Sequence, residues 1–273
     1  MRAASRETYA LAIGKLDGIA RSADATALAK IGDELLGVAS LLDREPRLRR
    51  ALSDPARSGA DRRALLDGLV ANAVGTDTRT ILGEVAGGRW SSAGELLDGV
   101  ENLGIEALLA GADQSGELGD VEDELFRFGQ IVDGSPQLAA TLADPSVQVG
   151  PRATILDALL DGKARPVTVR LAKVALAGFG GRTFIGGLTR LVELAAARRD
   201  KQVAYVTVAK PLSEAEEERL ATRLKTLYGR DISLKIAVDE AVLGGARVMV
   251  GSDLYDGTTL RRLSDTRHAL AGK

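Results

Sequence analysis

Residues that could carry catalysis or bind a metal are few in this chain of 273 residues. The chain has no cysteine, and its one histidine, His268, lies beside Arg267 in an expected helix. A typical zinc site needs several cysteine or histidine ligands, and thiolate chemistry needs cysteine. The sequence therefore predicts no metal site and no reactive thiol, and we interpret His268 as an exposed helical residue.

Glycine-lysine pairs can belong to phosphate-binding loops, and two occur, at Gly14-Lys15 and Gly162-Lys163. Such a loop also needs Ser or Thr after the lysine and a second glycine five residues before the paired one. Neither pair has these residues. The glycine-rich segment 178–181 lies between expected helices without a preceding strand, which is unlike a dinucleotide site. The sequence therefore predicts no bound cofactor.

Carboxylates, which could act as general acids or bases, are numerous but are interspersed with basic residues. The 38 acidic and 36 basic side chains give a formal net charge of −2. Runs such as 43–45 and 216–219 are typical of solvated helix faces. No carboxylate is expected in an apolar segment that would raise its pKa for acid–base work. We therefore predict that the chain is not an enzyme by itself.

The composition also disfavours binding to nucleic acid and insertion into a membrane. A phosphate-binding surface needs clustered Lys and Arg, and the aromatic residues that would stack on bases make up only 3% of the chain. No apolar stretch approaches the roughly 18 residues of a spanning helix, and the segment 1–7 is too polar for a secretory signal. The sequence predicts a cytoplasmic chain that reaches a membrane only through partners.

The elements that position these side chains begin with an internal repeat. Two segments 90 residues apart carry the same ordered set of proline, leucine and aspartate positions. The clearest matches are Pro46 with Pro136, Leu48 with Leu138, Leu52 with Leu142, Asp54-Pro55 with Asp144-Pro145, and Asp33-Glu34-Leu35 with Asp123-Glu124-Leu125. We infer a duplicated helical half and call its members the first copy and the second copy.

Each copy has the pattern of a series of short helices. Apolar residues recur at spacings of three and four within 25–43, which indicates one buried helix face. Similar helices are expected at 46–53, 64–70 and 80–85 in the first copy, and at 118–133, 136–142, 150–160, 166–178 and 182–199 in the second. The amphipathic stretch 92–112 between them contains no proline and no Gly-Ser linker. We expect it to be one helix that both copies share and that couples them rigidly.

After residue 200 the periodicity changes from that of helices to that of strands. The segments 202–209, 232–238 and 246–250 alternate or are rich in β-branched residues, so we expect three strands. Ser213 and Glu216 have the spacing of a capping box for a helix at 214–228.

The sequence therefore predicts a mostly α fold with a small C-terminal α/β unit of strand-helix-strand-strand-helix order. Gly244-Gly245 is expected to supply the tight connection between the second and third strands. The last helix is expected to open at Asp256-Gly257 and to carry Leu260, Leu263 and Leu270. The expected domains are a first helical bundle at 1–105, a second at 106–200 and an α/β domain at 201–273.

The C-terminal residues contain an ordered set of short motifs. In chain order these are Pro211-Leu212-Ser213, Val238-Asp239, Leu243-Gly244-Gly245, Val250-Gly251 and Asp256-Gly257. The set resembles the C-terminal part of the delta subunit of F-type ATP synthases, the OSCP family, and the helical half resembles the N-terminal domain of that family. Ordinary members carry one bundle, so the duplication resembles the long actinobacterial form. We interpret the motif residues mainly as structural; they are Pro211, Ser213, Asp239, Gly244, Gly245, Gly251, Asp256 and Gly257.

The resemblance implies a non-catalytic stator subunit that couples rotation to ATP synthesis. The implied partners are alpha subunits of the catalytic head, bound in grooves between helices, and b-type subunits of the peripheral stalk, bound by the α/β end. The implied location is the cytoplasmic face of the cell membrane, as a peripheral member of the complex. Because the second copy is joined directly to the α/β unit, we expect it to dock the head through helix 166–178, with Leu171, Val174 and Leu176.

Two other classes of function stay open at this point. A helical-repeat adaptor unrelated to ATP synthase would have the same bundles, but it would not account for the ordered C-terminal motifs. An enzyme with an unrecognised site would need catalytic residues that the sequence does not display.

Overall fold

The computed structural model describes residues 1–259, which divide by their contacts into two compact units. Unit 1 comprises residues 1–121 and 140–187, and unit 2 comprises residues 122–139 and, within the described range, 188–259. Most of the expected last helix, with Leu260, Leu263 and Leu270, lies outside the described residues, as does His268. The three-domain division expected from the sequence stays a prediction.

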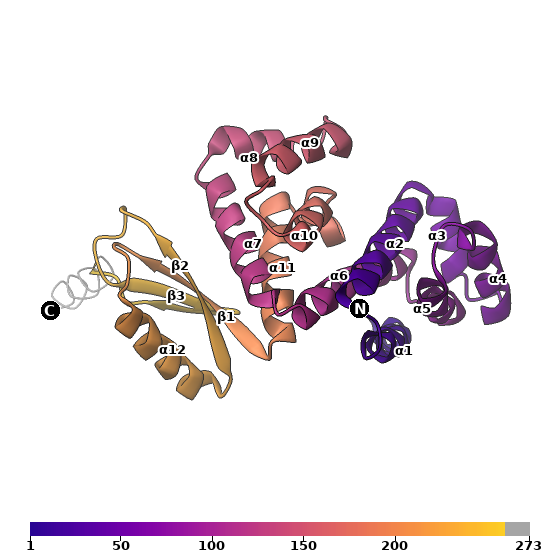
Figure 1. Cartoon of the computed structure of the whole chain (residues 1–273), viewed down its shortest axis with the longest axis horizontal. Coiled ribbons are helices and arrows are strands. Elements are labelled where there is room, and N and C mark those ends of the chain that lie inside the picture. The colour runs from indigo at the N-terminus through magenta and orange to yellow at the C-terminus, as the bar shows by residue number, and fades with distance from the viewer. Residues whose placement is uncertain (260–273) are drawn as a thin grey trace, which may run out of the picture. The chain divides into compact units, whose positions relative to one another are not determined.

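The first part of unit 1 is a bundle of helices (indigo to magenta in Figure 1). Its members are α1 (Ala3–Ala20), α2 (Ala25–Arg44), α3 (Pro46–Ser53), α4 (Gly59–Val70), α5 (Thr76–Gly87) and α6 (Ala93–Gln114). Asp24 caps α2 by accepting the Ala27 N–H at 2.7 Å, and Ser92 caps α6 by accepting the Glu95 N–H at 3.1 Å. The apolar faces of these helices form one core, as their periodicity predicts.

Helices α4 and α5 begin earlier than the apolar pattern indicates. The first turns, 59–63 and 76–79, carry almost no large apolar residues. They are helical because Ser58 caps α4 by accepting the Asp61 N–H and because acidic residues occupy both first turns. Hydrophobic periodicity cannot detect a helical turn that is polar on every side.

Helices α2 and α6 pack with their backbones close together. A Cβ added to Gly32 of α2 would lie 2.7 Å from Leu108 Cγ and 3.0 Å from the Gly104 carbonyl oxygen of α6. A Cβ added to Gly104 would lie 2.8 Å from Leu36 Cγ. Glycine at both positions therefore permits this approach. Helix α6 is continuous over its whole length, which confirms the single helix expected at 92–112.

The rest of unit 1 comes from the second copy. It contains α9 (Val149–Leu160), α10 (Pro166–Leu176) and the short 3-10 turn η1 (Phe179–Gly181), and α8 (Pro136–Ala143) crosses the boundary between the units. Helix α10 contacts both α9 and α6. The shared helix α6 therefore touches elements of both copies within unit 1.

Unit 2 joins two helices of the second copy to a mixed sheet. It holds most of α7 (Leu118–Asp133) and α11 (Phe184–Arg198), then β1 (Lys201–Val208), α12 (Glu214–Tyr228), β2 (Asp231–Val238), β3 (Ala246–Val250) and β4 (Asp253–Asp256). The strand order is β2-β1-β3-β4, with β1 parallel to β2 and antiparallel to β3. Helix α12 packs on one face of this sheet (Figure 1) through a small apolar core. The fold class expected from the sequence is confirmed.

Two details of the sheet correct the sequence prediction. A fourth strand, β4, pairs with β3, and its Asp256 ends a strand where the last helix was expected to open. Strands β2 and β3 are also not neighbours, because β1 lies between them. The connection that carries Gly244-Gly245 therefore runs from the end of β2 past the end of β1, where the Asp239 N–H donates to the Val208 carbonyl at 2.9 Å.

Candidate functional site

Clusters of metal-ligating side chains are not found in the part of the chain that the structure describes. Among residues 1–259, no group of three or more His, Cys, Asp or Glu side chains could hold a metal ion. No helix in the same range combines the length and the apolar character needed to cross a membrane. A candidate site of another kind, a groove on the surface, lies in unit 1.

Unit 1 contains a groove of about 620 Å³ whose walls come from both copies. Helices α2 and α6 form one wall, and α10 with the start of α9 forms the other. The apolar lining residues are Leu36, Ala39, Val149, Val174 and Ala177, and the charged ones are Asp33, Asp43, Arg44, Glu101, Arg170 and Lys173. We call this feature the α2/α10 groove. Its apolar lining with a charged rim suits an amphipathic helix.

Ion pairs fix the walls of the α2/α10 groove. Arg170 of α10 lies 3.0 Å from the Asp33 carboxylate of α2, so one pair joins the two copies. Lys173 of α10 lies 2.7 Å from the Asp157 carboxylate of α9. These side chains are 38–48% exposed, so each pair contributes little stability and mainly sets the position of the wall.

One acidic residue of the groove departs from the sequence expectation. Glu101 of α6 accepts the Gly180 N–H at 3.3 Å, and burial raises the pKa of its carboxyl above the ordinary value. Burial also raises the pKa of Asp98, one turn earlier. The expectation that no carboxylate lies where its pKa would be raised is therefore wrong for these two residues. Neither belongs to a cluster of catalytic side chains.

The residues predicted to bind a partner separate into two groups. Leu171 and Leu176 are 0% and 3% exposed and belong to the core. Val174, on the same helix, lines the α2/α10 groove. Of the three, Val174 is the one whose side chain a partner could contact without unfolding α10. A role in protein binding stays a prediction.

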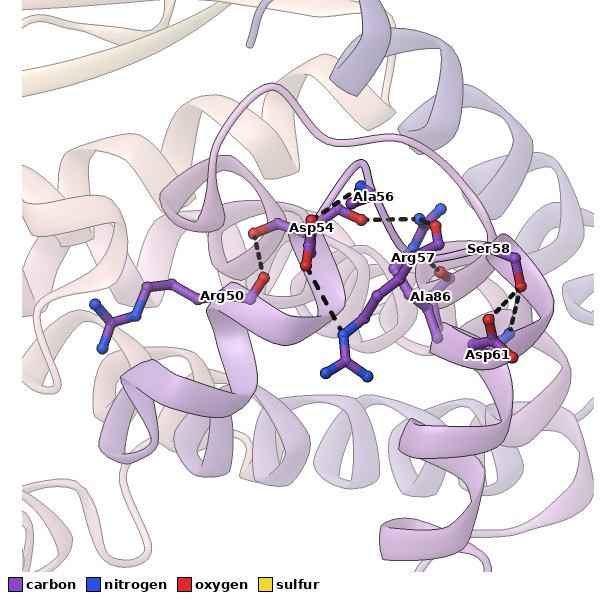
Figure 2. Close-up of polar contacts among 9 residues, drawn as sticks. Arg50, Asp54, Ala56, Arg57, Ser58, Asp61 and Ala86 are labelled. Atoms are coloured by element: carbon purple, nitrogen blue, oxygen red, sulfur yellow. Dashed lines mark hydrogen bonds and ion pairs between the residues drawn. The ribbon is translucent and has the colours of Figure 1, made fainter.

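The first copy has a smaller cavity between α4 and α5, the counterparts of α9 and α10. Its volume is about 230 Å³, and Asp67 and Arg79 lie on its rim in a two-bond ion pair at 2.8 and 3.0 Å. The preceding Asp-Pro turn is held by local bonds, as Figure 2 shows: the Asp54 carboxylate accepts the Ala56 N–H, and the Ser58 hydroxyl donates to Asp61. These contacts are all local to the first copy.

The motif residues of unit 2 occupy turns. Gly244, Gly245 and Gly251 have φ values of 100°, 80° and 58°, in the left-handed region that favours glycine. A Cβ on Gly245 would overlap the carbonyl oxygen of Gly257, whose N–H donates to the Ala246 carbonyl at 2.9 Å. Gly244 and Gly245 therefore allow the connection before β3 and the one after β4 to lie against each other, and Gly251 lies in the turn between β3 and β4.

The other motif residues stabilise chain ends. The Asp239 and Asp256 carboxylates accept the N–H groups of the residues two positions later, at 2.9 and 3.1 Å. Ser213 is the N-cap residue of α12, and the Glu216 carboxylate accepts its N–H and its hydroxyl at 2.8 and 2.6 Å. Pro211 lies in the connection between β1 and α12. These geometries describe local structure and leave contacts with a partner untested.

Sequence reasoning missed a buried ionic cluster in unit 2. Glu122, Asp123, Arg199, Ser233 and Lys235 come together there from α7, the end of α11 and β2. One signal in the sequence could have found it. Glu122 follows Val121 and lies between Leu118 and Leu125 on the apolar face of its helix, where a solvated carboxylate would not be expected.

The sequence is similar to that of known ATP synthase subunits over most or all of its length. The family model described as ATP synthase delta (OSCP) subunit matches residues 106–270. The ATP synthase subunit delta of Salinispora arenicola is 61% identical over 269 residues, which cover 98% of each chain. The subunits delta of Streptomyces griseus and Thermobifida fusca are 42% and 38% identical over 272 residues, with full coverage of each chain.

A weaker similarity concerns a solved structure. A chain of the Toxoplasma gondii mitochondrial ATP synthase hexamer matches 61% of this chain and 94% of its own length, with a TM-score of 0.37 and 20% identity.

Proposed function

Because the chain belongs to the ATP synthase delta (OSCP) subunit family, we propose that its second copy binds alpha subunits of the catalytic head and that its C-terminal sheet binds b-type subunits of the peripheral stalk. The family role is that of a stator subunit, which is structural and carries out no catalysis itself. Similarity over the full length supports this role and not that of an unrelated helical adaptor.

The observation that carries the assignment to the second copy is the extent of the family match. The model begins at residue 106, inside α6, and covers the second copy and the sheet. The segment common to the family is therefore the part of the chain that follows the first copy. We propose that this segment performs the docking common to the family and that the first copy adds a wall to the α2/α10 groove.

The α2/α10 groove supports this proposal by its chemistry. Its apolar lining could bind the apolar stripe of an amphipathic helix from an alpha subunit, and its acidic and basic rim could orient that helix. Burial of one valine side chain contributes roughly 1.5 kcal/mol, about a tenfold change in affinity. Rim charges affect orientation and association rate more than they affect affinity.

The sheet offers a separate surface in unit 2. Met249 of β3 and Leu254 of β4 are cross-strand partners, and their side chains are 44% and 60% exposed. Exposed apolar pairs of this kind suit contact with another protein. We propose that b-type subunits contact this pair and that the chain lies at the cytoplasmic face of the membrane as a peripheral member of the complex.

Single-cysteine crosslinking in the assembled synthase tests these assignments. Because the chain has no cysteine of its own, each variant provides one attachment point. We expect Val174→Cys to crosslink to alpha subunits and Leu254→Cys to b-type subunits. Leu69→Cys, on α4 of the first copy and 55% exposed, is the matched control. Crosslinks to alpha from Leu69→Cys and none from Val174→Cys would assign head binding to the first copy.

Affinity measurements test the groove itself. Val174→Asp places a charge on its apolar lining and should weaken binding to the isolated catalytic head by about tenfold or more. Leu69→Asp should change that affinity by less than about twofold. Leu171→Asp is unsuitable, because a charge at a fully buried position would unfold the bundle. Unchanged affinity of a folded Val174→Asp variant would exclude the α2/α10 groove as the docking site.

A further inference from the structure

The buried ionic cluster of unit 2 is centred on Glu122. This side chain is 0% exposed, and its carboxylate contacts groups from two other elements. The Ser233 hydroxyl of β2 donates to it at 2.5 Å, and the Lys235 ammonium, also of β2, lies 2.9 Å away. The Arg199 guanidinium, directly after α11, donates at 2.9 Å. One carboxylate therefore joins α7, the end of α11 and the sheet.

The charges of the cluster balance. Lys235 is 3% exposed and also lies 2.5 Å from the Asp123 carboxylate, so two carboxylates face two cations. A buried ion pair adds little net stability compared with apolar packing, but removing one partner leaves an uncompensated buried charge. The cluster thus penalises any state in which α7 and β2 separate, because Glu122 and Lys235 would each lose their buried partner.

Two further features lie where α7 and the end of α11 meet the sheet. The rings of Phe126 on α7 and Tyr205 on β1 lie 6.2 Å apart between centroids, one helical turn from Glu122. Asp200, between Arg199 and β1, has a φ of 55°, which is uncommon outside glycine. This turn separates the end of α11 from the start of β1 and leaves Arg199 within reach of Glu122.

We propose that the cluster acts as an internal lock that makes α7 and the C-terminal sheet one cooperative body. The change from helices to strands near residue 200 is then a change of secondary structure and not a flexible joint. If the proposed function holds, the lock provides a stiff connection between α7 and the sheet that binds the stalk. The stiffness itself is a property of the isolated chain and does not depend on either partner.

Native-state hydrogen exchange of the full chain in increasing denaturant tests the lock. In the wild-type protein, the slowest amides of α7 and β2 should converge on the same opening free energy and denaturant dependence. Glu122→Gln should lower protection in both elements together by about 100-fold, because Lys235 loses its buried partner. Asp33→Asn, which removes an exposed acid of the first copy, is the matched control and should leave both elements unchanged.

Two outcomes would overturn the proposal. One is separate opening of α7 and β2 in the wild-type chain, with different denaturant dependence. The other is a loss of protection in Glu122→Gln that is confined to one element. If Glu122→Gln does not fold, the wild-type measurement still decides the matter. Because no alpha or b-type subunit is present, failure here would leave the docking assignments standing.

Discussion

The same position in the two copies of the duplicated half has opposite chemistry. Gly32 of α2 lacks a side chain and lets α2 approach the backbone of α6. Its counterpart 90 residues later, Glu122 of α7, carries a charge into the interior and binds Lys235 and Arg199. The first copy uses this position to pack helix against helix. The second copy uses it to hold helix α7 against strand β2 of the sheet.

The aspartates next to Gly32 and Glu122 show the same contrast between an exposed and a buried contact. Asp33 and Asp123 occupy equivalent positions, and each pairs with a cation from another element, Arg170 or Lys235. The two aspartates are about equally exposed, at 47% and 51%, but Arg170 is 38% exposed and Lys235 only 3%. A surface ion pair and a buried cluster therefore occupy matching places, and only the buried one constrains the fold strongly.

Removal of the buried carboxylate should have the largest effect on stability. Glu122→Ala leaves Lys235 buried beside Asp123 alone, and we expect the free energy of unfolding to fall by about 3–5 kcal/mol. Asp33→Ala should change it by less than about 1 kcal/mol. Urea unfolding monitored by circular dichroism measures both values. Equal effects of the two substitutions would remove the contrast between the copies.

The arginine after each Asp-Pro turn gives the second contrast. Arg62 is 5% exposed and donates to the carbonyl groups of Asp54, Arg57, Ala86, Gly87 and Gly88. Its counterpart Arg152 is half-buried and donates to the carbonyls of Leu142 and Val147. We therefore expect Arg62→Met to lower the free energy of unfolding by about 3 kcal/mol and Arg152→Met to lower it by about 1 kcal/mol. The same urea unfolding assay measures both values. A larger loss from Arg152→Met would contradict this ranking.

Glycine substitutions in α2 test the close approach to α6. Gly32→Ala should destabilise the chain by about 1 kcal/mol net, because overpacking against Leu108 and Gly104 exceeds the gain in helix propensity. Gly37→Ala, in the same helix but with open space around the new Cβ, should stabilise it by about 1 kcal/mol. Thermal melts of the two variants should shift in opposite directions. Stabilisation by both would show that α2 and α6 are less closely packed.

An exposed carboxylate should give the smallest effect and a defined pH dependence. The hydroxyl and N–H of Ser213 donate to Glu216 and hold the pKa of Glu216 below its ordinary value of 4.5. A folded pKa below the unfolded one adds stability that is complete above the unfolded pKa and is lost as pH falls through the folded value. The difference in Tm between wild type and Glu216→Gln should therefore shrink between about pH 6 and about pH 3. A constant difference would contradict this assignment.

Much of the helical architecture could be predicted because it depends on local patterns. The spacing of Leu28, Ile31 and Leu35 indicates α2, and the absence of proline from 92–112 indicates a continuous α6. The same pattern could not separate Val174 from Leu171, because periodicity identifies an apolar face without showing whether this chain or a partner covers it. Tertiary packing alone makes that distinction.

The features that escaped prediction depend on long-range pairing. Strand β4 is short and exposed throughout, so it gives no alternating apolar signal, and it becomes a strand only by pairing with β3. The order of the strands depends on pairing across the unit. Glu122 and Lys235 are 113 positions apart in the sequence and appear as ordinary surface charges until the fold brings them together.

Paired double-mutant cycles test most directly whether equivalent positions of the two copies have different roles. One cycle combines Glu122→Gln with Lys235→Met, and the other combines Asp33→Asn with Arg170→Met, all measured by urea unfolding of the full chain. We expect a coupling free energy of about 2 kcal/mol or more for the buried pair and less than about 1 kcal/mol for the exposed pair. Couplings of equal size in the two cycles would contradict the account.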